Sequence, residues 1–171
     1  MEQIQEMLDH ISVEVEAAVE KRKQLWGKID TTEIKSQLQN FYKQYSDSED
    51  HKIVISYLKS SYITGSHKFK LASYEEEPFV ELYPPHEYLN MKPLFDNIEA
   101  DMTVFTKQLS QHFFRLMPSE QEEIRRHYME MLYIESALFF KRVLSETDPD
   151  IKATSIFFGA ELGEVKRMGA I

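Results

Sequence analysis

Eight residues between positions 4 and 29 follow one another at alternating steps of four and three, the spacing that lines side chains along one stripe of a helix. They are Ile4, Leu8, Ile11, Val15, Ala18, Arg22, Leu25 and Ile29. Arg22 is the one charged residue in this otherwise apolar stripe. Residues 1–20 carry six acids and no Lys or Arg, whereas residues 21–28 carry four bases. The helix dipole favours this order, so the pattern predicts a long amphipathic helix over residues 1–29.

This helix can bury its stripe in either of two ways. It can pack on the rest of its own chain, or it can pair with the same helix of a second copy. Antiparallel pairing would place each acidic half against a basic half. We therefore keep a homodimer through residues 4–29 as one partner hypothesis, beside packing within the chain and an unrelated protein partner.

Apolar residues at helical spacing predict four further helices. They cover about residues 30–45, 49–63, 90–117 and 119–146. Only Met117-Pro118 separates the last two, so we expect them to pack as an antiparallel helical hairpin at the core. From Tyr128 to Leu144 the chain is apolar nearly all round, which is typical of a buried central helix.

Two segments, residues 67–83 and 153–170, have the alternation or the β-branched and aromatic residues of β-hairpins. Neither hairpin should be stable alone, so we expect both to join one small antiparallel sheet. The predicted fold class is mainly α (α+β): about five helices around a helical hairpin, with a small sheet from two hairpins. The length of 171 residues suits one domain over residues 1–171.

Composition excludes several classes of protein. The chain has no cysteine, which removes disulfides, thiolate zinc sites and a cysteine nucleophile, and fits a reducing compartment. No apolar run approaches the roughly 20 residues of a membrane span, and the acidic start lacks the pattern of a secretory signal. The net charge of −9 disfavours a nucleic-acid surface. We therefore expect a cytoplasmic protein that binds neither membrane nor nucleic acid.

No catalytic motif stands out. The five glycines have neither the spacing of a dinucleotide-binding loop nor that of a phosphate-binding loop, and no G-x-S-x-G sequence occurs. We therefore expect no cofactor. The missing motifs favour a protein without catalytic activity.

One constellation could hold a metal ion. Glu123 and His127 are four residues apart, hence neighbours on one helix face, and the predicted hairpin would bring His112 level with Glu123. Two imidazoles and a carboxylate can bind a metal or share a proton. The alternative is an exposed ion pair beside a histidine at the edge of the core.

A second constellation could hold a small ligand. Glu135 falls in the middle of the apolar arc that contains Tyr128, and Arg142 points in nearly the same direction. A charge in such an arc costs several kcal/mol unless it is paired. The three residues either line an internal polar pocket or find partners on other helices.

The leading functional hypothesis is a cytosolic, non-catalytic protein-interaction or regulatory module. It depends on the missing catalytic motifs and on the stripe of residues 4–29. The alternative is a small-ligand-binding protein or an enzyme with a polar site inside the helical bundle.

Overall fold

The computed structural model describes residues 2–45, 51–75, 79, 83–147, 151, 156–161 and 163–168. The chain divides into two compact units, and helix α6 contributes to both. Unit 1 comprises residues 1–28 and 94–135, and unit 2 comprises residues 29–93 and 136–171. Whether these two units fold together as one domain is not decided by this division, so the single domain over residues 1–171 stays a prediction.

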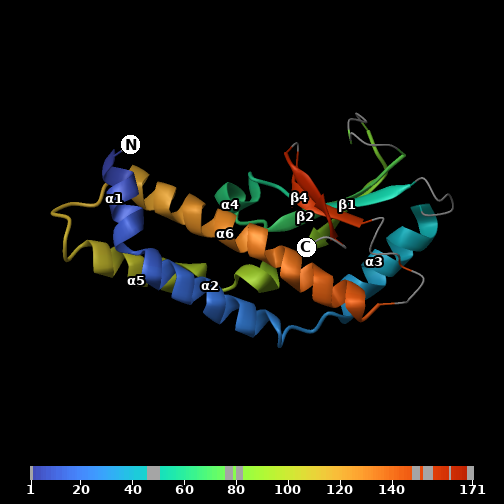
Figure 1. Ribbon diagram of the computed structural model, residues 1–171, viewed down its shortest axis with the longest axis horizontal. Coiled ribbons are helices and arrows are strands. Elements are labelled where there is room, and N and C mark those ends of the chain that lie inside the picture. Colours follow the sequence, from blue (N-terminus) through green and yellow to red (C-terminus); the bar gives the residue numbers. More distant parts are fainter. Residues whose placement is uncertain are drawn as a thin grey trace. The chain divides into compact units, whose positions relative to one another are not determined.

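Unit 1 is helical (Figure 1). It contains α1 (Glu2–His10), α2 (Ser12–Trp26), the end of the 3-10 helix η1 (Lys92–Phe95), α5 (Ile98–Leu109) and the first part of α6 (Pro118–Ser145). The helix predicted over residues 1–29 is interrupted at Ile11, whose φ of −104° and ψ of 10° are not helical. The chain therefore enters α2 in a new direction.

The stripe predicted in residues 4–29 is partly correct. Ile11, Val15 and Arg22 are buried as predicted, whereas Leu25 is 47% exposed. The turn at Ile11 and the true helical repeat of 3.6 residues rotate the stripe away from a strict seven-residue repeat. The buried positions become Met7, Ile11, Val15, Val19, Arg22 and Trp26. In α2 these side chains pack within unit 1, where α2 contacts α5.

The predicted helical hairpin is present as α5 and the first half of α6, joined by the α5–α6 loop (residues 110–117). The Phe105 and Tyr128 rings lie 5.1 Å apart in an edge-to-face arrangement. Glu99, near the start of α5, pairs with Arg125 of α6, and Figure 1 shows that the two helices run antiparallel. The prediction extended the first of these helices over residues 90–117, but α5 covers only Ile98–Leu109.

Unit 2 is built on a five-stranded mixed sheet of order β3-β2-β1-β4-β5. The strands are β1 (Lys52–Tyr57), β2 (Lys68–Tyr74), β3 (His86–Asn90), β4 (Ile156–Ala160) and β5 (Val165–Arg167). β1 and β4 pair in parallel, and all other neighbours are antiparallel. The unit also contains α3 (Thr32–Tyr45), the short α4 (Ser61–Thr64) and the end of α6.

The predicted small antiparallel sheet from two hairpins is therefore wrong. The central part of the helix predicted over residues 49–63 is instead strand β1, in which Ile53 through Tyr57 are all buried. Only its end, in the short α4, is helical, and residues 49 and 50 lie outside the described residues. A central strand that is covered on both faces loses its period-two alternation and reads as a short apolar run, which periodicity cannot distinguish from a buried helix. This missed strand is the one that joins the two predicted hairpin regions.

The two hairpin predictions fare differently. β2 pairs with β3, which follows the predicted hairpin of residues 67–83, and residues 76–78 and 80–82 of that prediction lie outside the described residues. β4 and β5 do pair as a hairpin, but β4 also pairs with β1. Residues 153–155, 162, 169 and 170 of that prediction lie outside the described residues. Within the described part of the chain, no helix is long and apolar enough to cross a membrane.

Candidate functional site

Tyr128, one of the three residues predicted to line a ligand site, lies in a buried polar cluster of unit 1. Its hydroxyl donates to Asp101 Oδ2 at 2.8 Å and accepts from Arg22 Nε at 3.2 Å. Arg22 also donates to Asp101 Oδ2, from Nε at 2.8 Å and from Nη2 at 2.5 Å. Its Nη1 donates to the backbone carbonyl of Asp96.

The electrostatics of this cluster support a structural role. Burial lowers the pKa of Arg22, but the hydrogen bonds to Asp101 and Tyr128 outweigh it and leave that pKa above its usual value. Burial, followed by the contact with Asp101, raises the pKa of Tyr128 well above its usual value. Arg22 is therefore charged and Tyr128 neutral at physiological pH. The charged break in the predicted stripe was the sequence signal for this cluster, although the sequence does not identify its partners.

Glu135 and Arg142, the other two predicted ligand-site residues, each have their own partner. Glu135 Oε2 lies 3.1 Å from Lys23 Nζ, and its side chain is 34% exposed. The Arg142 guanidinium lies 5.3 Å from the centre of the Phe139 ring, and its Nε lies 4.0 Å from Glu146. The ion pair with Lys23 accounts for the charge of Glu135 without a ligand, and the shared ligand site stays a prediction.

The three predicted metal ligands are not brought together. His112 is exposed and its ring centre lies 4.0 Å from that of His10. Glu123 pairs with Arg126 on the same helix, and His127 is exposed. Among the described residues, no three His, Asp or Glu side chains gather closely enough to hold a metal ion.

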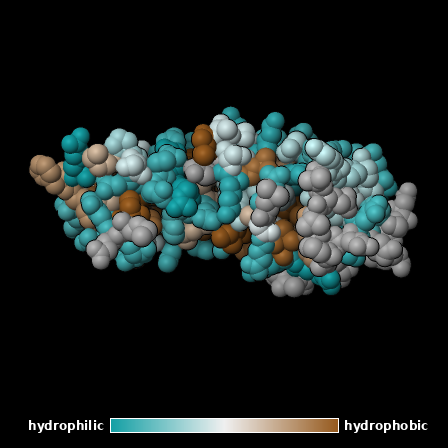
Figure 2. Space-filling model, turned by 90° about the horizontal axis from the view of Figure 1, so that it is seen from above, coloured by the Kyte–Doolittle hydropathy of each residue, from teal (hydrophilic) through white to brown (hydrophobic). Residues whose placement is uncertain are grey.

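The α5–α6 loop carries an exposed apolar surface that the sequence reading missed. Phe114 is fully exposed at 107%, and Met117 is 44% exposed. The ring of the preceding residue, Phe113, packs at 6.0 Å against His10 at the end of α1. Figure 2 shows apolar surface at its left edge, where Figure 1 places this loop. The prediction had hidden the loop inside a longer helix.

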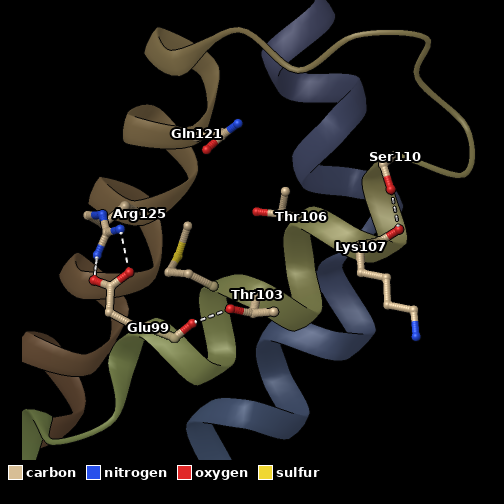
Figure 3. Close-up of a pocket in the computed structure, with 8 residues that line it drawn as sticks. Glu99, Thr103, Thr106, Lys107, Ser110, Gln121 and Arg125 are labelled. Carbon is tan, nitrogen blue, oxygen red and sulfur yellow. Dashed lines mark hydrogen bonds and ion pairs between the residues drawn. The ribbon is translucent and has the colours of Figure 1, made fainter.

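A second surface feature is an open pocket of about 470 Å³ between α5 and the first half of α6 (Figure 3). Glu99 and Arg125 close one side with a two-pronged ion pair, whose longer hydrogen bond is 2.9 Å. This pair lowers the pKa of Glu99 and raises that of Arg125. Thr106 and Gln121 extend toward the pocket from its two helices. The lining residues are Glu99, Met102, Thr103, Thr106, Lys107, Ser110, Gln121 and Arg125.

Comparison of the chain with models of protein families, with curated proteins and with solved structures finds no match. The geometry of the described residues is therefore the basis for the functional proposals below.

Proposed function

We propose that this chain is a cytosolic, non-catalytic protein-interaction module and that the α5–α6 loop is its contact surface. The observation that carries the proposal is the full exposure of Phe114 at 107%. Burying a phenylalanine side chain is favourable by about 1.5–3 kcal/mol relative to leaving it in water. A partner that covers Phe114 would therefore gain this stabilisation. Aromatic side chains of this kind dominate the energetics of protein interfaces.

The position of the loop supports this role. The rings of His112 and Phe113 both pack against that of His10, so the loop is attached to the end of α1 immediately before Phe114. A loop held in place in this way loses less conformational entropy when it binds than a free one. Met117, at the other end of the loop, adds a flexible apolar side chain of the kind that adapts to a partner surface.

Two observations support a non-catalytic module. The tyrosines with the most strongly raised pKa, Tyr128 and Tyr133, are 0% and 2% exposed, so a substrate cannot reach them. The cluster around Arg22 satisfies its charge internally. The cytosolic location is proposed from the missing cysteines.

The predicted homodimer through residues 4–29 receives less support. Val15, Val19 and Trp26 are each 4% exposed, so a partner could use this stripe only after α2 had left α5. We therefore place the contact with a protein partner at the loop.

A photoreactive phenylalanine analogue in place of Phe114 tests this function. We expect irradiation of the cells that make the protein to yield one discrete protein adduct. The matched control carries the same analogue in place of Val104, which is 55% exposed on α5. Wild-type protein made in the same cells should compete for the adduct, whereas Phe114→Ser protein should not. Equal adducts at both positions, or no adduct at position 114, would contradict the proposal.

The pocket between α5 and α6 supports a second candidate function, the binding of a small polar molecule. Its volume is within the range of ligand sites, and Thr106 and Gln121 offer a hydroxyl and an amide to it. Ligand-observed NMR with a set of small polar molecules tests it. Hits that bind the wild type but not Gln121→Leu would support this candidate, and a set without such hits would contradict it.

A further inference from the structure

The outer face of α6 carries exposed apolar side chains at helical spacing. Ile134 is 55% exposed, Leu138 is 45% exposed, and Met131 is half-buried. Since successive residues of a helix are about 100° apart, these three side chains lie within about 60° of one another around the helix axis. The opposite face of α6 is buried, with Leu132 and Phe140 among its fully buried apolar side chains. α6 is thus apolar on two sides, of which one faces solvent.

Charged residues flank this exposed stripe in a self-complementary order. Glu130 precedes Ile134 by one turn, and Lys141 follows Leu138 by almost one turn. Both lie on the same edge of the stripe, within about 40° of Ile134. α6 is continuous from Pro118 to Ser145, so these relative positions follow from the geometry of one helix.

We propose that a second copy of this chain docks on the outer face of α6, with the two helices antiparallel about a two-fold axis that crosses this face at the level of Ser136 along the helix. In this register Ile134 packs against the partner's Leu138, and Leu138 against the partner's Ile134. Glu130 then lies beside the partner's Lys141, and the symmetry provides this ion pair twice. The partner's buried surface is the same as that of the first copy.

The charges select the orientation. A parallel pair would place this charged edge of the two copies on opposite sides of the interface, so Glu130 would not reach the partner's Lys141 and neither ion pair would form. Flanking charges set partner choice and orientation in helix pairs by this rule. Arg126 lies 4.0 Å from Glu130 in its own chain, a distance at the limit of an ion pair that leaves Glu130 able to bind a closer partner.

A contact made by one helix face is smaller than the about 1,200–2,000 Å² that stable complexes bury, so we expect a reversible dimer with a dissociation constant of about 1–100 µM. This surface contains no residue of the α5–α6 loop. The dimer and the proposed function can therefore fail independently of each other.

Charge reversal tests the proposal by sedimentation velocity of the full chain over a range of protein concentrations. Glu130→Lys and Lys141→Glu should each weaken the dimer by about tenfold or more, because each turns two attractions into two repulsions. The double variant Glu130→Lys/Lys141→Glu should restore the wild-type dissociation constant to within about threefold.

Matched variants separate the stripe from other exposed residues. Ile134→Ser should weaken the dimer, whereas Val104→Ser, which alters an equally exposed residue of α5, should not. Phe114→Ser should leave the dimer intact. A wild-type chain that stays monomeric, a double variant no tighter than the single ones, or equal effects of Ile134→Ser and Val104→Ser would each overturn the proposal.

Discussion

Replacing Asp101 with alanine removes the carboxylate that balances the buried charge of Arg22. Arg22 is 6% exposed, and two of its four hydrogen bonds end on Asp101 Oδ2. The third ends on Tyr128, whose own hydroxyl loses its acceptor in the variant. Asp101→Ala therefore leaves a buried guanidinium without a counter-ion and a buried hydroxyl group without an acceptor for its proton.

The expected cost follows from this burial. Removing one partner of a buried ion pair costs about 3–5 kcal/mol. We expect a value near the lower limit, about 3 kcal/mol, because the Asp101 side chain is 14% exposed and water can reach part of the vacated space. With an ordinary dependence on denaturant, the urea midpoint should fall by about 1–2 M.

Tryptophan fluorescence can measure this loss in unit 1. Trp26 is the only tryptophan of the chain, is 4% exposed, and donates its indole N–H to the backbone carbonyl of Leu94. It lies one helical turn after Arg22 in α2, so its emission reports the unfolding of the helices that hold the cluster.

Two further variants make the reasoning refutable. Glu123→Ala breaks an exposed ion pair with Arg126 and should cost less than about 1 kcal/mol. Arg22→Met combined with Asp101→Leu removes both charges and should recover most of the loss. The reasoning is refuted if Asp101→Ala costs no more than Glu123→Ala, or if the double variant is as unstable as Asp101→Ala.

Three other predictions concern a surface ion pair and two glycines. Arg125 lowers the pKa of Glu99, so this pair stabilises the protein above pH 4.5 and is lost as the pH falls through the lowered value. Melting curves from about pH 5 to about pH 3 should therefore show a smaller loss of stability for Glu99→Gln than for the wild type, by well under about 1 kcal/mol because the pair is exposed. Gly159→Ala should cost about 3 kcal/mol or more, since the new Cβ would lie 2.2 Å from the Glu164 carbonyl oxygen; a thermal shift as small as that of an exposed substitution would contradict this. Gly65→Ala should cost only about 1–2 kcal/mol in the same assay, because its φ of +62° is strained for alanine but no atom lies within 4 Å.

The amphipathic character of residues 4–29 could be predicted because helical periodicity is a local property. Ile11, Val15 and Arg22 are buried as their spacing indicates. The break between α1 and α2 at Ile11 could not be predicted, since neither glycine nor proline marks it. Pro118 did mark the start of α6 correctly, because proline is tolerated in the first turn of a helix.

Local sequence patterns could not predict how the strands of the sheet pair. β1 is covered on both faces, so the alternation that identifies a strand is missing from Ile53–Tyr57. Its parallel partner β4 begins about a hundred residues later, at Ile156, and no local pattern specifies such a distant pairing. The prediction therefore joined the two hairpins directly in one antiparallel sheet, whereas β1 lies between both regions and pairs with β4 in parallel.

The candidate sites likewise have one part that follows from the sequence and one part that depends on the tertiary structure. The sequence by itself determined that Arg22 interrupts an apolar stripe and must be compensated, because an unpaired buried charge is too costly. Only the tertiary structure decided that Asp101, 79 positions away, compensates it, and that Tyr128 belongs to the same cluster. The exposure of Phe114 was likewise decided in three dimensions, because whether a side chain is buried depends on which distant elements cover it.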